Sequence, residues 1–427
     1  MRLKPKNARI QPPKRVQQKP LNARLRNFSC RNLRFPGYNM LNPGGTEVAR
    51  MLGPRLHISA IALLAAIASS THAGTTVYSN DFENPDKVGK EWSATNVETT
   101  PRNGRHFLGN FTTDKLTFKL DDLPKHEFVR ITLELYIMNT WDGNAVFSTR
   151  GSRIGPDAWK MELDGGLELV NATFSNLDFN SPNIVKEAQT QSYPSLLPGE
   201  SHPARTGATE NNTLGFDWPL NNLGPQPVDS VYKMTFTLPH TAGSVQFNFA
   251  GAEGLQPADD ECWGLDNVKV EVLDAADLKP PDVAATRLLW DAIGGPNPAA
   301  ETEAFWKLVE GGDKVADFLR NNVKKSDVDK KKFSGLMLAL DGDDFEAREK
   351  ATEDVANLGP AAEALIRDAL RRSESLEVKT RLSAALRKLH STAPVDPEMR
   401  RRAIALKLLR IIGTKEAEKV ALELSGK

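Results

Sequence analysis

The stretch "DDECWGLDNVKVEV", residues 259–272, shows a clear strand pattern and carries an acidic residue within it. Successive side chains of a strand point to opposite faces, so Val268, Val270 and Val272 share one face with Asp266. A carboxylate in line with buried valines needs a partner, because an unpaired charge at the edge of an apolar face costs several kcal/mol. The stretch therefore predicts both a buried strand and a binding partner for Asp266.

Further stretches show the same alternation and predict short strands. "KLTFKL" (115–120), "FVRITLELYI" (128–137) and "VQFNFA" (245–250) each place apolar residues at every second position. "MELDGGLEL" (161–169) is typical of a hairpin, because its glycines tolerate the positive φ that a tight turn requires. Strands with one apolar face must bury that face against a second sheet, so we expect an antiparallel β-sandwich over residues 74–274.

Residues 176–227 interrupt this pattern. They are rich in Asn, Pro and Gly and alternate little. A long excursion of this kind is usually a surface loop, and such loops often carry function.

The hydrophobic period changes after "KPPD" (279–282), which we interpret as part of a linker over residues 275–283. "ATRLLWDAIGG", "ETEAFWKLVEGG" and "DKVADFLRNNV" predict short amphipathic helices that end at helix-breaking residues. The helical pattern continues to Leu424. Antiparallel helix pairs about 40 residues apart are typical of an α-solenoid, in which neighbouring pairs cover each other's apolar faces.

The charge of the chain is unevenly distributed. Residues 1–73 hold 13 of the 55 Lys and Arg but only one of the 55 Asp and Glu, so residues 74–427 carry 42 basic and 54 acidic side chains. An acidic protein is a poor polyanion binder, which argues against nucleic acid as a partner. Residues 1–50 are basic and lack an apolar period. They are expected to be disordered, or untranslated if Met51 is the true first residue.

Residues 51–73 resemble a secretory signal peptide. The apolar run "ISAIALLAAIA" (58–68) follows two arginines, and small residues at Thr71 and Ala73 predict cleavage after Ala73. The run is short for a membrane span, which needs roughly 20 residues, so we expect no transmembrane segment after cleavage. Cys262 would then be the one remaining cysteine and could form no intrachain disulfide. Export without disulfides favours a secreted or periplasmic protein of the bacterial envelope.

The two parts of the chain each resemble a known kind of domain. Residues 284–427 resemble HEAT-like helical repeats, on the basis of "LDGDDFEAREKATEDVANLG", "SLEVKTRLSAALRKL" and "LRIIGTKEAEKVALEL". Such repeats imply a scaffold that contacts proteins. The sandwich is similar to exported jelly rolls of the laminin-G-like, MAM-like and carbohydrate-binding type, through "NDFEN" (80–84) and "WGLDNVKV" (263–270). It lacks the cysteines of MAM domains.

The jelly-roll resemblance implies that the first and last strands lie side by side and that a structural calcium joins them. The metal ligands carried over from the resemblance are Glu83 and Asp266, with Asp81 as a third candidate. A hard cation with six to eight oxygen ligands would neutralise an acid beside Val268. Alternatively, backbone N–H groups at a turn satisfy Asp266.

A second candidate site combines "NTWDGN" (139–144) with "GPDAW" (155–159). Indole faces and oxygen acceptors together suit a sugar, and the candidate ligand-binding residues are Trp141, Asp142, Asn144, Asp157 and Trp159. In the alternative interpretation, residues 142–144 form a turn and both tryptophans belong to the core.

No nucleophile elbow, phosphate loop or zinc-protease motif occurs in the sequence. We therefore expect an exported, non-catalytic binding or scaffold protein, with a glycan or an envelope protein as partner. The enzymatic alternative is a glycoside hydrolase or lyase that uses Asp142 and Asp157. Hydrolysis requires two carboxyl groups roughly 5 to 10 Å apart across an open cleft.

Overall fold

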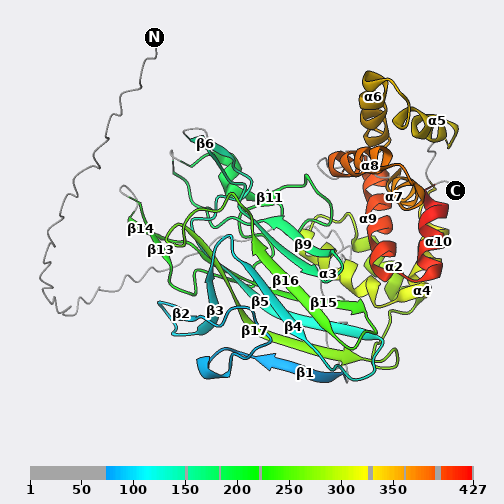
Figure 1. Cartoon of the computed structure of the whole chain (residues 1–427). Coiled ribbons are helices and arrows are strands. Elements are labelled where there is room, and N and C mark those ends of the chain that lie inside the picture. Colours follow the sequence, from blue (N-terminus) through cyan, green and yellow to red (C-terminus); the bar gives the residue numbers. More distant parts are fainter. Residues whose placement is uncertain are drawn as a thin grey trace, which may run out of the picture. The chain divides into compact units, whose positions relative to one another are not determined.

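The computed structural model describes residues 74–149, 152–181, 184–220, 224–325, 330–359, 362–389 and 396–425. The expected extension (1–50) and signal peptide (51–73) lie outside the described residues. Antiparallel strands occupy the first part of the described chain, and helices follow them (Figure 1). The change from strand to helix falls between Leu273 and Val283, as the hydrophobic period predicts.

The larger sheet has the strand order β12-β15-β5-β17-β3-β2, and β1 pairs with β17 outside this path. The central strands β5 and β17 place alternating apolar residues toward the sandwich core, including Ile131, Leu133 and Val270, none of which is exposed. The first and last strands therefore lie side by side, as expected. The bounds of these strands are β1 Thr75–Asn80, β2 Val97–Thr99, β3 His106–Phe111, β5 Phe128–Asn139, β12 Glu210–Asn211, β15 Asp229–Pro239 and β17 Glu261–Leu273.

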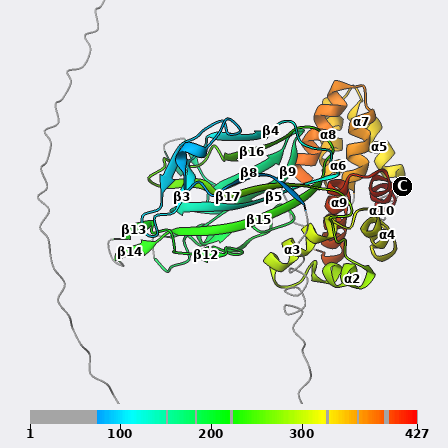
Figure 2. The same cartoon turned by 90° about the horizontal axis from the view of Figure 1, so that it is seen from below.

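The second sheet has the order β4-β16-β8-β9, with bounds Lys115–Leu120, Val245–Gly251, Ala158–Leu163 and Leu167–Thr173. Strands β8 and β9 form the expected hairpin, with Gly165 and Gly166 both at positive φ. Aromatic rings in edge-on contact link the facing sides of the two sheets. Tyr78 of β1 lies 4.7 Å from Phe118 of β4, and Trp159 of β8 lies 6.0 Å from Trp263 of β17. The strand-rich part is thus a two-sheet antiparallel sandwich (Figure 2).

The long segment that we expected to be a surface loop contains short ordered elements. These are a 3-10 helix at Lys186–Gln189 and the strands β10 Thr190–Gln191, β11 His202–Pro203, β12, β13 Asp217–Leu220 and β14 Gly224–Pro227. A further hairpin joins β6 Phe147–Thr149 and β7 Ser152–Ile154. Residues near β12 also cover the outer face of the larger sheet. Leu214 packs there with Phe107, Tyr136 and Cys262, so this face is partly apolar as well.

The helical part packs in sequence-adjacent pairs, among them α2 with α3, α5 with α6, and α9 with α10. Asp344 caps α6 by accepting from the backbone N–H groups of Glu346 and Ala347, which explains the acidic run before this helix. Gly413 ends α9 in the left-handed conformation. The helix bounds are α2 Val283–Ala292, α3 Pro298–Val309, α4 Gly312–Asn322, α5 Lys330–Leu340, α6 Phe345–Ala356, α7 Glu363–Arg372, α8 Leu376–Leu389, α9 Pro397–Ile412 and α10 Lys415–Leu424.

The sequence pattern of "FEAREKATEDVANL" predicts an apolar helix face formed by Phe345, Ala351, Val355 and Leu358, and Phe345 departs from it. Ala351 and Val355 are buried, whereas Phe345 is 62% exposed and lies beneath the guanidinium groups of Arg348 and Arg381. Phe345 is the first residue of α6, and its side chain reaches solvent at that end of the helix. No helix in the described part of the chain has the length and apolar character needed to cross a membrane.

Candidate functional site

Asp266 finds its partners within the protein. Its carboxylate accepts a hydrogen bond from the Tyr136 hydroxyl at 2.6 Å and another from the backbone N–H of Asn267 at 2.6 Å. Burial raises the pKa of Asp266 to about 6, and these hydrogen bonds partly offset that effect. One of the two donors is a backbone N–H and the other is a phenol. This arrangement is close to the alternative interpretation of the sequence, in which backbone N–H groups satisfy Asp266.

Asn267 has a positive φ at an irregularity of β17, where the register shifts so that Asp266 lies opposite Glu134 while Val270 lies opposite Ile131 of the core. Asp266 therefore points to the outer face of the larger sheet, and the expectation that it shares a face with Val268, Val270 and Val272 is wrong, because the irregularity reverses the alternation.

The other predicted calcium ligands have separate environments. Glu83 accepts from the backbone N–H of His106 and pairs with its ring Nδ1 at 2.9 Å, and these contacts hold the pKa of Glu83 below its usual range. Asp81 is exposed, and its carboxylate accepts from the N–H of Glu83. Among the described residues, Asp81, Glu83 and Asp266 do not form a compact group of acidic oxygens. Calcium between the first and last strands stays a prediction.

The indole rings of Trp141 and Trp159 are fully buried. Trp141 donates its N–H to the carbonyl of Cys262 at 3.0 Å, and Trp159 stacks on Phe249 in the sandwich core. Neither ring presents a face to solvent. The sugar platform that we predicted from these two tryptophans is therefore wrong, because the sandwich core uses both rings as packing.

The two aspartates of that candidate site do come together. Asp142, Asp157 and Glu261 each offer a carboxylate oxygen within 4.8 Å of the others. Asp157 and Glu261 have no exposed surface. The acids thus lie close enough for paired chemistry, but a fully buried Asp157 leaves no open cleft between the carboxyl groups, which hydrolysis requires.

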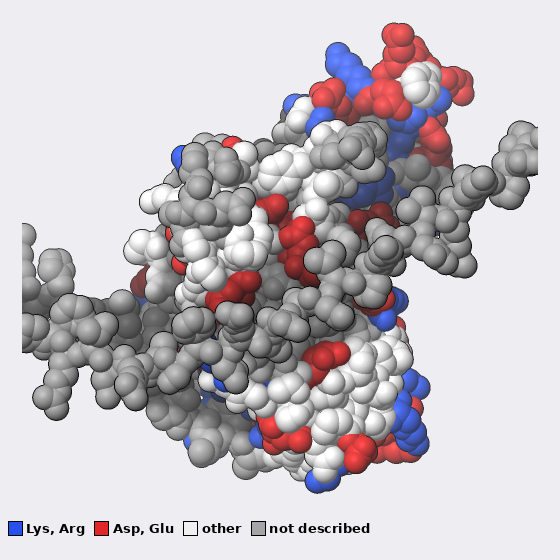
Figure 3. Space-filling model, turned by 90° about the vertical axis from the view of Figure 1, so that its left-hand side faces the viewer, with Lys and Arg blue, Asp and Glu red and all other residues white. Residues whose placement is uncertain are grey.

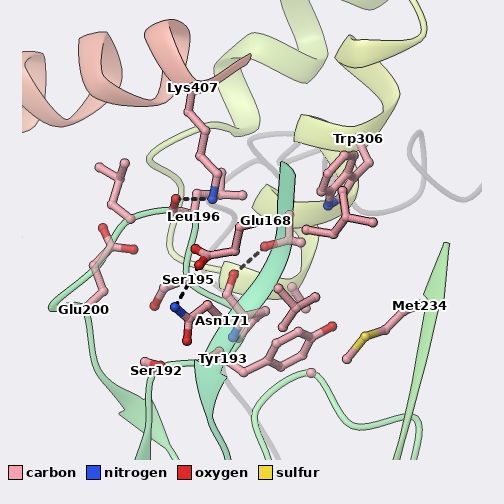
Figure 4. Close-up of a pocket in the computed structure, with 18 of the residues that line it drawn as sticks. Glu168, Asn171, Ser192, Tyr193, Ser195, Leu196, Glu200, Met234, Trp306 and Lys407 are labelled. Atoms are coloured by element: carbon pink, nitrogen blue, oxygen red, sulfur yellow. Dashed lines mark hydrogen bonds between the residues drawn. The ribbon is translucent and has the colours of Figure 1, made fainter. Parts of the chain in front are cut away.

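Asn144 lies at a different place, on the wall of a cavity of about 1250 Å³. This cavity, which we call the cleft, is bounded by β9, by the loop of residues 192–201, by β15 and by helix α3. Figure 4 shows Trp306 entering from the helical side and Glu168 and Asn171 entering from β9. Asn171 donates to the Glu168 carboxylate at 2.9 Å. The cleft therefore joins an aromatic ring with amide and carboxylate groups.

The Trp306 ring is held in place by its neighbours. It is half-buried and meets Phe236 of β15 edge-on, with ring centroids 4.8 Å apart. The partial exposure leaves ring surface available at the cleft, in contrast to Trp141 and Trp159. An aromatic ring fixed on one edge and open on the other is a common element of small-molecule sites.

Buried polar contacts close the floor of the cleft. Arg130 of β5 donates to the Thr237 hydroxyl at 2.9 Å and lies 3.5 Å from the Glu310 carboxylate, which follows α3. On the opposite wall, the Lys407 ammonium of α9 donates to the carbonyl of Leu196 at 2.8 Å. Burial lowers the pKa of Lys407 to about 8. Strand, loop and helices therefore meet at this site through specific polar contacts.

The loop that lines the cleft is organised by Gln191, which is fully buried. Its carbonyl oxygen accepts from the backbone N–H groups of Ser175 and Arg205, and its amide donates to the carbonyls of Tyr193 and Thr206. The Tyr193 ring stacks on Phe174 at 4.9 Å and also lines the cleft. The stretch "QSYP" (191–194) thus anchors its loop through Gln191 and forms part of the cavity wall through Tyr193.

The sequence did not point to the cleft. Its walls come from a hairpin strand, a long loop and three helices that are distant in sequence, and Trp306 follows the same helical pattern as the buried residues around it. Exposure of the ring is a consequence of tertiary packing. The one available signal was the length of the 176–227 segment, which suggested a functional loop.

Similarity to known proteins is confined to structure. No family model and no curated protein sequence matches the chain. Solved structures do match part of it. One is a GH115 4-O-methyl-alpha-glucuronidase with specificity for decorated arabinogalactans, at 14% identity and TM-score 0.22, covering 47% of this chain and 18% of the enzyme.

Two further matches contain carbohydrate-binding modules. The mannan-recognising module TmCBM27 is 12% identical with a TM-score of 0.23, and the match covers 46% of this chain and 97% of the module. The CBM22-1 and GH10 modules of Clostridium thermocellum xylanase 10B, complexed with xylohexaose, are 9% identical with a TM-score of 0.19, covering 47% and 28% of the two chains. These TM-scores are too low to support an argument from similarity. The description of the sandwich therefore rests on the strand pairing of this chain, and that of the cleft on the residues that line it.

Proposed function

We propose that this protein is an exported, non-catalytic glycan-binding protein that takes an oligosaccharide in the cleft. The observation that carries the proposal is the cavity of about 1250 Å³ in which the half-buried Trp306 ring lies among polar side chains. Ligand sites typically enclose about 300 to 1000 Å³, so this volume suits several sugar units better than one.

The chemistry of the walls supports a sugar. Sugar hydroxyls both donate and accept hydrogen bonds, while their C–H faces pack on aromatic rings. The cleft offers carboxylate acceptors at Glu168 and Glu200, amide groups at Asn171, and hydroxyls at Ser192 and Ser195 (Figure 4). This mixture of donors and acceptors matches a polyhydroxylated ligand better than an apolar one.

The surface charge supports a partner other than nucleic acid. On the face drawn in Figure 3, acidic side chains are scattered across the middle, and most basic side chains lie toward the margins. The acidic balance of residues 74–427 has the same implication. Phosphate backbones bind to continuous basic surfaces, so a neutral or weakly charged glycan fits better.

The direct test is a glycan array with the full chain, followed by calorimetric titration of the glycans that bind. Trp306→Ala is expected to weaken binding at least tenfold, which corresponds to about 1.4 kcal/mol for the loss of an aromatic contact. Trp218→Ala removes a partly exposed tryptophan that does not line the cleft and should retain binding. Equal affinity of both variants, with each folded by thermal melting, would refute a glycan site in the cleft.

The glycoside hydrolase or lyase alternative predicts product formation. The same glycans should be incubated with the protein and analysed for shortened or unsaturated products. Under the non-catalytic proposal, each ligand is recovered intact. Products whose formation requires Asp142 and Asp157 would instead support the enzymatic alternative.

Export is the second part of the proposal and rests on the apolar run before Ala73. N-terminal sequencing of the mature protein should begin at Gly74, and the protein should fractionate outside the cytoplasm. A stable product that retains residues 58–68 would support a membrane anchor in place of a cleaved signal.

For the helical part, we propose contact with an envelope protein. Support comes from large apolar side chains that the helices leave exposed, namely Leu338, Phe345 and Leu376. They belong to neighbouring elements, because the Ser375 hydroxyl before α8 donates to Asp341 after α5 at 2.8 Å. Replacing all three with serine should abolish capture of the envelope partner by the full chain and leave glycan binding intact.

A further inference from the structure

The buried acids Asp142, Asp157 and Glu261 come from three separate parts of the sandwich. Asp142 follows β5, Asp157 precedes β8, and Glu261 begins β17. Because β8 belongs to one sheet and β5 and β17 to the other, the cluster lies where the two sheets approach each other. The cleft is lined by other residues, so this acidic cluster is a separate feature of the molecule.

The hydrogen bonds around the cluster leave one buried oxygen without a donor. Glu261 accepts from the backbone N–H of Gln256 at 2.6 Å and from its side-chain amide at 3.0 Å. One oxygen of Asp157, Oδ2, accepts from the backbone N–H of Asp142. The other oxygen, Oδ1, is fully buried and accepts no hydrogen bond from an N–H or hydroxyl group in the described part of the chain. The neighbouring Glu261 carboxyl can donate to Asp157 only when it is protonated. A buried carboxylate oxygen without a donor is strongly unfavourable.

Among the residues that the structure describes, no basic side chain pairs with the cluster. In the described part of the chain, no ion pair involves any of the three acids. A fourth acid, Asp260, also raises the pKa values of Asp142 and Glu261 through its charge. Burial, followed by the charge of Glu261, raises the pKa of Asp142 to about 7 and that of Asp157 to about 9. Three buried carboxyl groups with oxygens within 4.8 Å of one another and no basic partner among the described residues require either bound protons or a cation.

We propose that Asp142, Asp157 and Glu261 bind a calcium ion that ties β5, β8 and β17 together. Calcium takes six to eight oxygen ligands in flexible geometry, and carboxylates, carbonyls and water all serve. Magnesium demands near-ideal octahedral geometry and gives up its water reluctantly, so it fits a dry cluster less well. The site differs from the one expected at Glu83 and Asp266, because the two sites share no ligand.

The site accounts for the unpartnered oxygen. A divalent cation would give Asp157 Oδ1 the positive neighbour that the protein does not supply. It would also join segments more than 100 residues apart in sequence, from Asp142 to Glu261. Because the ion binds the folded form, it stabilises that form by an amount that grows with the logarithm of the free ion concentration above its dissociation constant.

The experiment begins with the full chain stripped of metal by a chelator and checked by elemental analysis. Millimolar calcium should raise the melting temperature of this protein by several degrees, and magnesium should have a smaller effect. Asp157→Asn replaces a carboxyl oxygen by an amide NH2 that can donate to the neighbouring carboxylates, so metal-free Asp157→Asn should melt above the metal-free wild type and show no response to calcium. Simple damage to the fold cannot both raise the melting temperature of the metal-free protein and remove its response to calcium.

Two controls locate the ion. Glu83→Gln changes the site expected between the first and last strands, and it should keep the full calcium response. If Asp157→Asn fails to fold, Glu261→Gln serves in its place. Terbium luminescence, excited through Trp141 beside Asp142, provides a direct binding signal that calcium should displace.

Several outcomes would overturn the proposal. A metal-free wild type that binds no calcium and shows an unchanged melting temperature would mean that the carboxyl groups are neutralised by protons. A calcium response that survives in Asp157→Asn but disappears in Glu83→Gln would move the ion to the first and last strands. Both results are distinguishable from failure of glycan binding, which concerns other residues.

Discussion

Two buried aspartates illustrate how much the immediate neighbours of a residue matter. Asp266 receives a phenol and a backbone N–H, while Asp157 receives one N–H and keeps an oxygen without a donor. Both carboxylates are almost fully removed from solvent. The donor set alone separates an aspartate that the protein satisfies from one that requires an added proton or cation.

A pair of histidines on the sandwich makes a separate prediction about single residues. His126 and His240 stack with centroids 5.0 Å apart, and Nε2 of one lies 2.7 Å from Nδ1 of the other. Burial, followed by the charge of His126, lowers the pKa of His240. A lowered pKa means that the neutral ring is favoured in the folded protein. The stabilisation is therefore fully present above the unfolded value of about 6.5 and is lost as pH falls through the folded pKa.

As pH is lowered from about 7.5 to about 5, we expect this histidine pair to lower the free energy of unfolding by less than about 1 kcal/mol, because His240 is partly exposed. The raised pKa values of Asp142, Asp157 and Asp266 act in the opposite direction, so the contribution of the pair is measured as the difference between wild type and His240→Gln. His240→Gln should remove this contribution from the pH profile. The control is His106→Gln, which removes a histidine elsewhere on the sandwich. An identical acid profile for wild type and His240→Gln would exclude the pair as the cause.

Among the secondary-structure elements, β17 shows how local chemistry positions strands. Gly264 pairs with Gly109 of β3. Because neither residue has a Cβ, the Phe107 ring fits against the two glycines. A Cβ on Gly264 would lie 2.4 Å from a Phe107 ring carbon and 3.0 Å from the Leu108 carbonyl oxygen. The glycine therefore allows an aromatic ring to cover the outer face of the sheet.

Gly264→Ala is expected to destabilise the sandwich by about 1 to 3 kcal/mol, the usual effect of overpacking a filled core. Chemical denaturation monitored by tryptophan fluorescence would measure it. Gly243→Ala is the matched control, because a Cβ there meets no atom within 4 Å. Equal stability of the two variants would show that Phe107 moves aside without cost.

Across the molecule as a whole, the strands and helices are joined by a short segment and by side-chain contacts. Residues 274–276, 279, 280 and 282 are exposed. Trp290, the first large aromatic residue of the helices, lies beneath Arg401 of α9. Across the cleft, Arg400 of α9 pairs with Glu200 of the loop and with Glu301 of α3.

Limited proteolysis with an unspecific protease is expected to cut between Asp274 and Asp282 and to leave a strand fragment and a helical fragment. Because polar contacts cross the cleft, the two fragments should elute together in size-exclusion chromatography until salt or denaturant separates them. Resistance of this segment under conditions that cut other exposed loops would contradict the predicted linker.

Local sequence patterns were sufficient to predict the succession of strands and helices and most of the buried faces. Periods of two and of about 3.6 residues report directly which side chains face a core, as Val270 and Val355 show. Breakers such as Gly165 and Gly413 report where elements end. These are local properties, so neighbouring residues are enough to predict them.

Which polar residues meet was evident only from the folded chain. Folding places Trp141 and Trp159 in the core and gives Asp266 a phenol from another strand. It gathers Asp142, Asp157 and Glu261 from three separate segments of the chain. It also opens a cavity beside Trp306, a residue whose local pattern matches that of a buried one. The physical reason is that burial, hydrogen bonding and charge compensation depend on contacts between residues far apart in sequence, and no local period encodes them.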